Sequence, residues 1–159
     1  MLILRRADHA LLAEPAISIA LRKTGSFPVK LIAPDLYRSI NLQEEWGRLY
    51  KIEAKIPQAG LAIIGDTNGK EELISKVLAE YDKSLAWYKN NKEEASKLVV
   101  KTLPMLEEKG LADSIEHVRF ENINAINSKK DLEFFFDILM QNDSKLIGGK
   151  LPNEDFYYK

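Results

Sequence analysis

Residues 7–33 read ADHALLAEPAISIALRKTGSFPVKLIA, and this stretch decides the fold class that the sequence predicts. The short apolar run at residues 7–13 ends at Glu14-Pro15 and is interpreted as a buried strand. A helix is expected to follow, because Pro15 suits a first helical turn, where its missing N–H costs nothing. A second strand is predicted at residues 29–33. A strand–helix–strand unit favours a parallel sheet with a right-handed crossover, so we expect an α/β fold.

The rest of the first half adds one strand and one short helix to this expectation. The helix between the first two strands is expected over residues 15–23, with Gly25 as the residue that ends it. Residues 43–50 are expected to form one or two helical turns. Residues 59–64 are nearly all apolar, as in a strand buried on both faces, and predict a third strand. Three strands make a small sheet for a chain of 159 residues, so we expect further strands from another chain or a longer parent protein.

The second half of the chain is expected to be helical. Apolar residues recur every four positions from Leu73 to Leu85, which is typical of the apolar stripe of a helix of about five turns. The starts of two later helices are predicted by approximate capping boxes, formed by Asn91 with Glu94 and by Ser128 with Asp131. Gly110 is expected to close a turn, and the tail from residue 145 to lie extended against the body. The predicted sheet is therefore short, parallel or mixed, and followed by a helix-rich second half.

Composition limits the function classes that the chain can serve. Apolar residues make up 45% of the chain, which suits a globular protein and argues against intrinsic disorder. The formal net charge is -1, with acidic and basic residues interleaved, so we expect no nucleic-acid partner. The absence of cysteine excludes disulfides, zinc–thiolate sites and a cysteine nucleophile. The opening MLILRR is not a signal peptide, because its apolar run is short and its charges follow that run.

Four phrases of the sequence, taken in order, carry a resemblance to a known family. They are ADHALLAEP at residues 7–15, IPQAGLA at residues 56–62, AWYKNNKEEA at residues 86–95, and IGGKLPNEDFYY at residues 147–158. This chain resembles the C-terminal half of the solute-binding proteins of ABC importers of the nitrate, sulfonate, taurine and thiamine-precursor type. The resemblance covers nearly the whole chain.

The resemblance implies a periplasmic-binding-protein-like fold of two α/β lobes that close around a ligand by hinge motion. Residues 1–57 would be the C-terminal piece of the second lobe, and residues 58–159 the crossover strand and returning helices of the first lobe. The chain would be the substrate-binding component of an importer, or its C-terminal fragment, and would bind a small polar or anionic solute for delivery to an ABC permease. An extracytoplasmic location, periplasmic or at the cell surface, follows from the resemblance alone. No enzymatic activity, cofactor or metal is expected.

Two alternatives stay open beside this reading. The first is an inactive orphan or interaction domain that forms a homodimer by pairing exposed sheet edges, because an unpaired edge strand is a template for association. The second is an enzyme of thiamine-precursor synthesis on the same fold, although the cysteine-rich motif expected of such an enzyme is absent.

The candidate ligand-binding residues are Glu14, Pro15, Gln58 and Trp46. Glu14-Pro15 lies where a predicted strand ends and a helix begins, and ligands of open α/β sheets lie at such strand ends. A plainer interpretation of Glu14 is a solvated carboxylate that stabilises a helix N-terminus. Gln58 lies at the predicted crossover between the lobes, and Trp46 lies in an irregular segment where it could line a pocket.

No catalytic motif is complete in this sequence. Residues 65–71, GDTNGKE, resemble a phosphate-binding loop, but the glycine spacing is one residue short. Glu71 also stands where Ser or Thr should hold magnesium. His9 and His117 lie far apart, and no spacing typical of metal ligands accompanies them.

Overall fold

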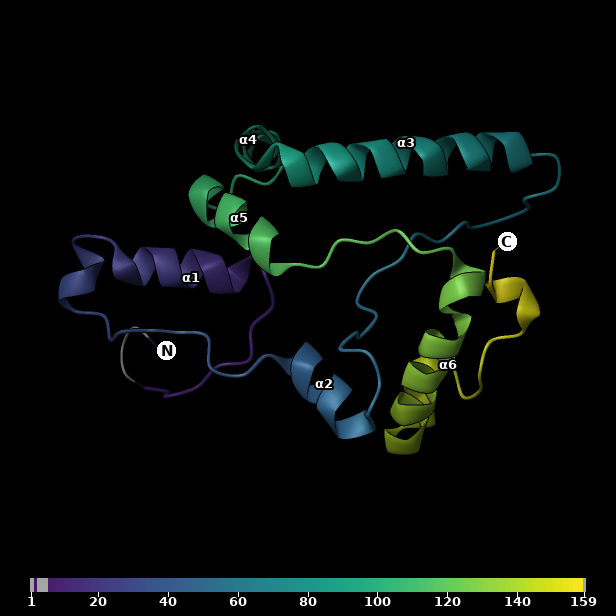
Figure 1. Cartoon of the computed structure of the whole chain (residues 1–159), viewed down its shortest axis with the longest axis horizontal. Coiled ribbons are helices and arrows are strands. Elements are labelled where there is room, and N and C mark those ends of the chain that lie inside the picture. Colours follow the sequence, from purple (N-terminus) through teal and green to yellow (C-terminus); the bar gives the residue numbers. More distant parts are fainter. Residues whose placement is uncertain (1, 3–5, 159) are drawn as a thin grey trace. The chain divides into compact units, whose positions relative to one another are not determined.

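A computed structural model describes residue 2 and residues 6–158 of the chain, and helices are the only regular secondary structure within them (Figure 1). The α/β prediction is therefore wrong, because the described residues form no strand and no sheet. The prediction for the opening six residues falls mostly outside the described part of the chain. The described residues divide into two compact units. Unit 1 contains the residues up to Ser39 and Gly69–Phe120, and unit 2 contains Ile40–Asn68 and the residues from Glu121 onward.

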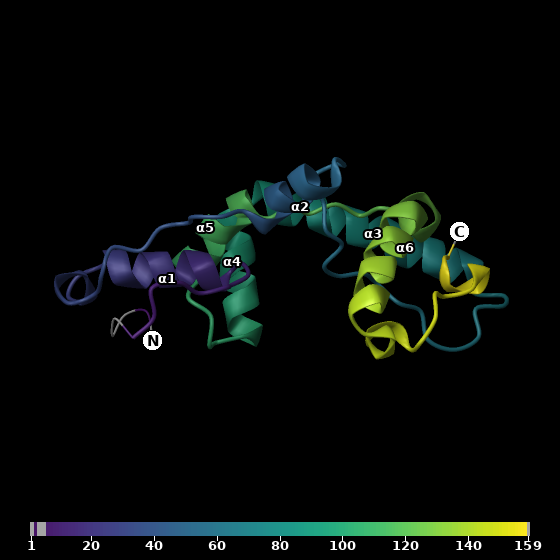
Figure 2. The ribbon, with the colours of Figure 1, turned by 90° about the horizontal axis from the view of Figure 1, so that it is seen from below.

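Unit 1 is built from four α-helices and two short 3-10 turns. The α-helices are α1 (Ala16–Gly25), α3 (Glu71–Asn90), α4 (Lys92–Thr102) and α5 (Glu108–Ser114); the turns are η1 (Val29–Leu31) and η2 (Ile115–His117). Helix α5 packs against both α1 and α4, while α4 turns away from the axis of α3 (Figure 1, Figure 2). The small core of this unit contains Leu111 and Ile115 from the α5–η2 segment together with Ala95 of α4.

Unit 2 consists of α2 (Leu42–Tyr50), α6 (Ala125–Asn142) and the turns η3 (Ser144–Ile147) and η4 (Glu154–Phe156). Trp46 of α2 contacts the rings of Phe134 and Phe135 of α6, with ring centroids 5.8 and 5.9 Å apart. The tail returns to α6, where Tyr157 is buried. The tail does lie against a helix, but it is not extended throughout, because η3 and η4 interrupt it.

The three predicted strands fail for a common physical reason. Residues 7–13 and 59–64 have no regular structure, and residues 29–33 begin with the turn η1. A strand needs neighbouring strands to satisfy its backbone N–H and C=O groups. No described segment pairs with these runs, and Ile64 is 96% exposed. The alternative of a homodimer paired through sheet edges loses its basis, because the described residues contain no sheet edge.

Most predicted helices lie where they were expected, but the residues at which several of them begin differ from the prediction. Helices α1, α2, α3 and α4 form where they were expected. Asn91 makes no side-chain cap for α4, because its amide donates to the Trp87 carbonyl instead. Ser128 lies inside α6, which begins after Asn124, and the Asn124 side chain accepts a hydrogen bond from the Ile126 N–H. Gly110 lies within α5 rather than closing a turn.

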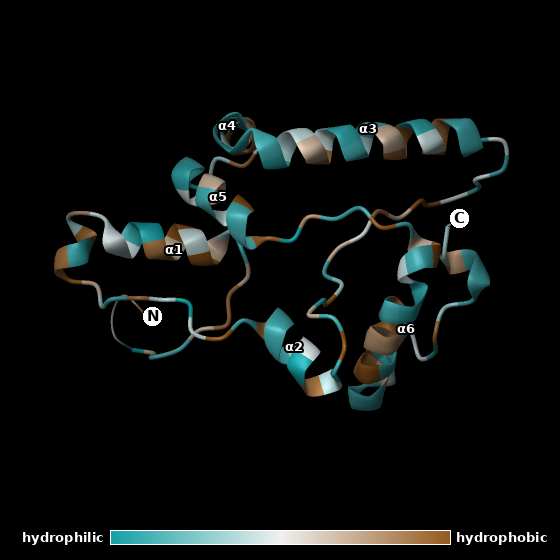
Figure 3. Cartoon of the chain, in the orientation of Figure 1, coloured by the Kyte–Doolittle hydropathy of each residue, from teal (hydrophilic) through white to brown (hydrophobic). Residues whose placement is uncertain are grey.

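Apolar side chains remain outside the small cores of both units. Figure 3 shows hydrophobic and hydrophilic residues alternating along α3, and several large apolar residues of that helix are exposed.

No helix within the described residues is long and apolar enough to cross a membrane. The predicted division at residues 57 and 58 concerns the lobes of a longer relative, and it stays a prediction.

Candidate functional site

A polar hollow of unit 1 lies between α1, the segment after η1, and the α5–η2 segment. It has a volume of about 410 Å³, and we call it the arginine pocket. The residues lining it are Ser18, Leu21, Arg22, Gly25, Ser26, Arg38, Asp113, Glu116 and His117. Two guanidinium groups, two carboxylates, an imidazole and two hydroxyls therefore surround one space.

One wall of the arginine pocket is held by Glu14, which lies just before α1. The Ser18 N–H donates to Glu14 Oε2 at 3.1 Å, so this carboxylate satisfies one of the free N–H groups at the start of the helix. Arg38 Nη2 donates both to Glu14 Oε1 at 2.7 Å and to Ser18 Oγ at 2.8 Å. Glu14 thus fixes the position of Arg38. This arrangement resembles the plainer interpretation of Glu14, except that the Glu14 side chain is only 9% exposed.

The opposite wall is a paired contact between α1 and α5. Arg22 donates from Nε to Asp113 Oδ2 at 2.8 Å and from Nη2 to Asp113 Oδ1 at 3.2 Å. Such a two-point pairing matches the planar guanidinium to the carboxylate and fixes its orientation. The hydrogen bonds from Arg22 hold the pKa of Asp113 below its usual value against a smaller opposing effect of burial, and His117 and Arg38 add to the lowering.

The turn η2 completes the pocket. Glu116 forms an ion pair with Lys92 at the start of α4, and this contact lowers the pKa of Glu116. His117 follows directly and lines the pocket beside Asp113. The pocket is thereby connected to three helices of unit 1, since its residues come from α1 and the α5–η2 segment and are tied to α4.

The free donor capacity of the arginines defines what this pocket can bind. A guanidinium has five N–H donors and no acceptor. Arg22 uses Nε and Nη2 on Asp113, and Arg38 uses Nη2 on Glu14 and Ser18. The remaining N–H groups suit an oxyanion such as a carboxylate, sulfonate or nitrate. The Ser18 hydroxyl accepts from Arg38, and the Ser26 hydroxyl donates to the Arg22 carbonyl at 2.6 Å, so the Ser26 oxygen can still accept a hydrogen bond. No described group of three or more His, Cys, Asp or Glu residues is arranged to hold a metal ion.

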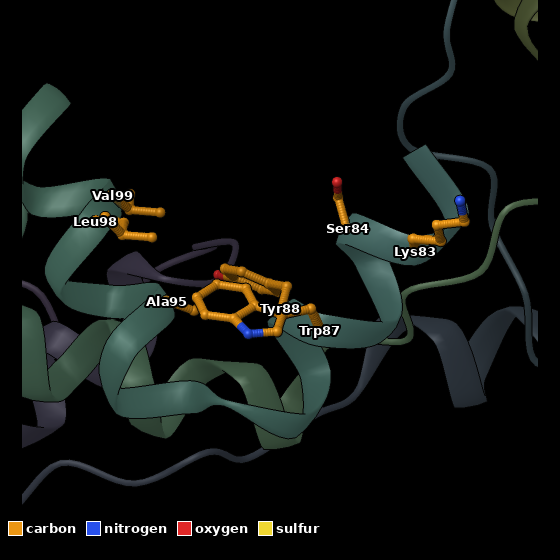
Figure 4. A pocket seen from close by; sticks show the side chains of 7 residues that line it. All are labelled: Lys83, Ser84, Trp87, Tyr88, Ala95, Leu98 and Val99. Carbon is orange, nitrogen blue, oxygen red and sulfur yellow. The ribbon is translucent and has the colours of Figure 1, made fainter. Parts of the chain in front are cut away.

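A second hollow, which we call the aromatic hollow, lies at the junction of α3 and α4 (Figure 4). Its volume is about 500 Å³, and its lining residues are Lys83, Ser84, Trp87, Tyr88, Ala95, Leu98 and Val99. Figure 4 shows Trp87 and Tyr88 close to Ala95, with Lys83 and Ser84 projecting from the preceding turn. The Tyr88 ring also contacts Phe120 at 5.3 Å, and burial raises the pKa of Tyr88. This hollow is mainly apolar.

The four residues predicted from sequence are distributed over both units. Glu14 and Pro15 lie in unit 1, where Glu14 supports the arginine pocket without lining it. Trp46 lies in unit 2, half-buried, with its ring 4.5 Å from that of Tyr50. Gln58 is exposed in a segment without regular structure. Their role in ligand binding stays a prediction.

Sequence reasoning missed the residues that line the arginine pocket. Arg22 and Asp113 are separated by 91 positions, and no local motif connects them. Arg38 lies 24 positions from Glu14, in a segment where the sequence offered no periodic pattern. The one sequence signal near the arginine pocket was Glu14, a carboxylate just before a predicted helix.

The function of Glu14 in the pocket leads to a prediction about acid stability. Burial raises the pKa of Glu14, but hydrogen bonds from Arg38 and Ser18 together lower it below its usual value. A lowered folded-state pKa adds stability that is complete above the unfolded-state pKa and is lost as the pH falls through the folded-state pKa. We expect Glu14→Gln to lower the free energy of unfolding at neutral pH by about 1–2 kcal/mol, and to flatten its decline between about pH 5 and pH 3.

This prediction is measured by urea unfolding at a series of pH values, followed by Trp87 fluorescence in a Trp46→Phe background. Glu94→Gln is the matched control, because Glu94 is exposed on α4 and its replacement should change the free energy of unfolding by less than about 0.5 kcal/mol. A Glu14→Gln variant with unchanged stability and an unchanged acid dependence would contradict the role given to Glu14.

Comparisons with known proteins add no relative to this description. No protein-family model matches the chain, and neither a curated protein nor a solved structure matches it. By its described residues, the chain is a small helical protein of two compact units. One unit carries a polar pocket with two arginines.

Proposed function

We propose that this chain binds a small polar or anionic solute in the arginine pocket and serves as the solute-binding component of an ABC importer. The observation that carries the proposal is the convergence of Arg22 and Arg38, from separate segments, on one hollow of about 410 Å³. Volumes of this order are usual for small-molecule sites.

The binding mechanism follows from the donors that face the pocket. The N–H groups of Arg22 and Arg38 that are not used on carboxylates hold the anionic group of the solute. The Ser26 oxygen, whose hydroxyl donates to the Arg22 carbonyl, accepts a hydrogen bond from a donor group of the solute. Asp113 and Glu116 favour a solute that also carries a positive charge, as an aminosulfonate such as taurine does. Because both arginines are already oriented by Glu14 and Asp113, little side-chain entropy is lost on binding.

The family resemblance supplies the physiological part of the proposal. The phrase ADHALLAEP ends at Glu14-Pro15, the dipeptide that the resemblance places near the ligand, and Glu14 holds Arg38 in the pocket wall. Delivery of the solute to an ABC permease outside the cytoplasm belongs to the same proposal. The two-lobed sheet expected for the family has no part in it, since the described residues form no strand.

The proposal is tested by calorimetric titration of the whole chain with taurine, methanesulfonate, nitrate, bicarbonate and a pyrimidine. We expect saturable binding of at least one oxyanion. Arg38→Gln should weaken that binding by at least about tenfold, because a charge-assisted hydrogen bond is lost. Arg48→Gln is the matched control: Arg48 is an exposed arginine of α2 in unit 2, paired with Glu45, and its replacement should leave binding unchanged.

Two results would refute the proposal. One is the absence of binding by all five solutes to a sample whose helices are shown to be folded by circular dichroism. The other is binding that the double variant Arg22→Gln/Arg38→Gln retains at full strength.

A further inference from the structure

The sequence contains a single Asn-Gly pair, Asn68-Gly69, which lies in a turn just before α3. Both residues are exposed, and neither belongs to a helix. Gly69 has a φ of 70°, in the left-handed region that glycine adopts without strain. Apart from its chain neighbours, no atom lies within 4 Å of a Cβ built at Gly69. The turn therefore has room to change its backbone conformation.

We infer that Asn68 is a site of spontaneous deamidation, which converts its carboxamide into a carboxylate in the folded chain. The inference is independent of solute binding. The reaction needs a side-chain carboxamide, the main-chain nitrogen of the next residue and water. Every other asparagine of this sequence is followed by a residue with a side chain, which hinders the approach of that nitrogen. Asn68 is therefore the asparagine whose reaction is hindered least.

The chemical step takes place within the Asn68-Gly69 pair. The Gly69 nitrogen loses its proton to hydroxide, and its electron pair forms a bond to Asn68 Cγ. The bond from Cγ to Nδ2 breaks, and the side-chain nitrogen takes up a proton and leaves as ammonia. Water then opens the resulting succinimide ring. Its attack at Cγ gives aspartate, whereas its attack at the main-chain carbonyl carbon gives isoaspartate, in which the chain runs through the side chain.

The reacting nitrogen is weakly held in the structure. The Gly69 N–H donates to Glu71 Oε1 at 3.2 Å, which is at the long end of the usual range for such a bond. Glu71 is exposed, so water can replace its carboxylate as the acceptor. Rotation of the Asn68 backbone, which brings the Gly69 nitrogen towards Cγ, thus breaks no helix hydrogen bond.

The pair Asn127-Ser128 shows how the fold protects a comparable site. Asn127 is exposed and is followed by a small residue, but both residues lie inside α6. The Ser128 N–H donates to the Asn124 carbonyl at 3.0 Å, and the helix holds the Ser128 nitrogen away from the Asn127 side chain. We therefore expect Asn127 to keep its carboxamide while α6 is folded.

Deamidation changes both the charge and the main chain at the start of α3. Lys70 provides no side-chain cap for this helix, and Glu71 and Glu72 already place acidic groups in its first turn. The product adds a further negative charge to a chain of formal net charge -1. Isoaspartate also lengthens the main chain by one carbon at the peptide bond where the chain passes from unit 2 into unit 1.

The first test is incubation of the whole chain at mildly alkaline pH and physiological temperature, followed by peptide mapping with mass spectrometry. We expect conversion of Asn68 while Asn127 keeps its carboxamide. Gly69→Ala should slow the conversion of Asn68 by about tenfold or more, because its Cβ hinders ring closure. Circular dichroism checks that this variant keeps its helices. Equal rates at Asn68 and Asn127, or a Gly69→Ala variant that reacts as fast as the original chain, would overturn the inference.

The second test traps the ring itself with hydroxylamine, which attacks a succinimide and breaks the chain there. The folded chain should be cut between Asn68 and Gly69 into fragments of residues 1–68 and 69–159. Asn68→Gln is the matched control and should stay intact, because its longer side chain does not form the five-membered ring. Cleavage of the original chain in urea but not in buffer would show that the folded turn prevents ring closure, and would refute deamidation in the folded chain.

Discussion

Replacing Gly110 with valine is expected to lower the free energy of unfolding of unit 1 by about 2–3 kcal/mol. A Cβ added at Gly110 would lie 2.7 Å from Ile19 Cγ1 and 2.8 Å from Ile19 Cα. It would also lie 2.8 Å from Glu107 Oε2. Because one of these atoms is backbone of α1, the contact is relieved only if α5 and α1 move apart. That movement would also break the pairing of Arg22 with Asp113, so solute binding should be lost with stability.

The two tryptophans allow this effect to be assigned to one unit. Trp87 belongs to unit 1 and Trp46 to unit 2, so Trp46→Phe and Trp87→Phe backgrounds each report one unit. In urea unfolding, Gly110→Val should shift the Trp87 transition to lower urea. Gly25→Val is the control, because no atom lies within 4 Å of a Cβ added there, and its effect should stay within about 0.5 kcal/mol. Equal stability of Gly110→Val and the original chain would show that α1 and α5 are not in close contact.

Replacing Tyr157 with alanine is expected to be the most destabilising change in unit 2, at about 3–5 kcal/mol. Tyr157 belongs to the tail, is 2% exposed, and contacts Lys129 and Glu133 of α6. Its ring contacts the Phe156 ring at 5.1 Å and the Lys129 ammonium at 5.2 Å. Its hydroxyl donates to Glu133 Oε1 over 3.4 Å. Removing the ring leaves a cavity that the tail cannot fill, so the tail should separate from α6.

Tyr157→Phe separates the ring from the hydroxyl in this effect. The ring contacts remain and only a long hydrogen bond is lost, so the cost should be about 1 kcal/mol or less. Both variants are measured by urea unfolding with Trp46 fluorescence in the Trp87→Phe background. A Tyr157→Ala variant as stable as the original chain would show that the tail does not depend on this side chain.

Helix positions could be predicted from the sequence because their signals are local. Apolar spacing from Leu73 to Leu85 locates α3, and Gly25 marks the end of α1. Helix ends were predicted less well where side chains found other partners, as Asn91 did with the Trp87 carbonyl. A helix satisfies its backbone within one segment, so its presence depends little on distant parts of the chain.

Strands and the binding pocket could not be predicted in the same way. An apolar run such as residues 59–64 becomes a strand only when another segment pairs with its backbone, and none does among the described residues. Trp46 illustrates the same limit at the level of one side chain, because its aromatic neighbours Phe134 and Phe135 are far away in the sequence. Which apolar residues find cover is a property of packing, not of the local pattern.

Local sequence patterns were enough to predict helices α1 to α4 and most of α6, to exclude cysteine chemistry, and to draw attention to Glu14-Pro15 just before α1; α5 was not predicted. The folded chain was needed to learn that Glu14 holds Arg38, that Arg22 pairs with Asp113, and that Leu73, Val77 and Tyr81 of α3 are exposed. The difference comes from the sequence separation of the interacting residues. Helix hydrogen bonds join residues four positions apart, whereas the contacts that build the pocket join residues up to 91 positions apart and exist only after the helices pack.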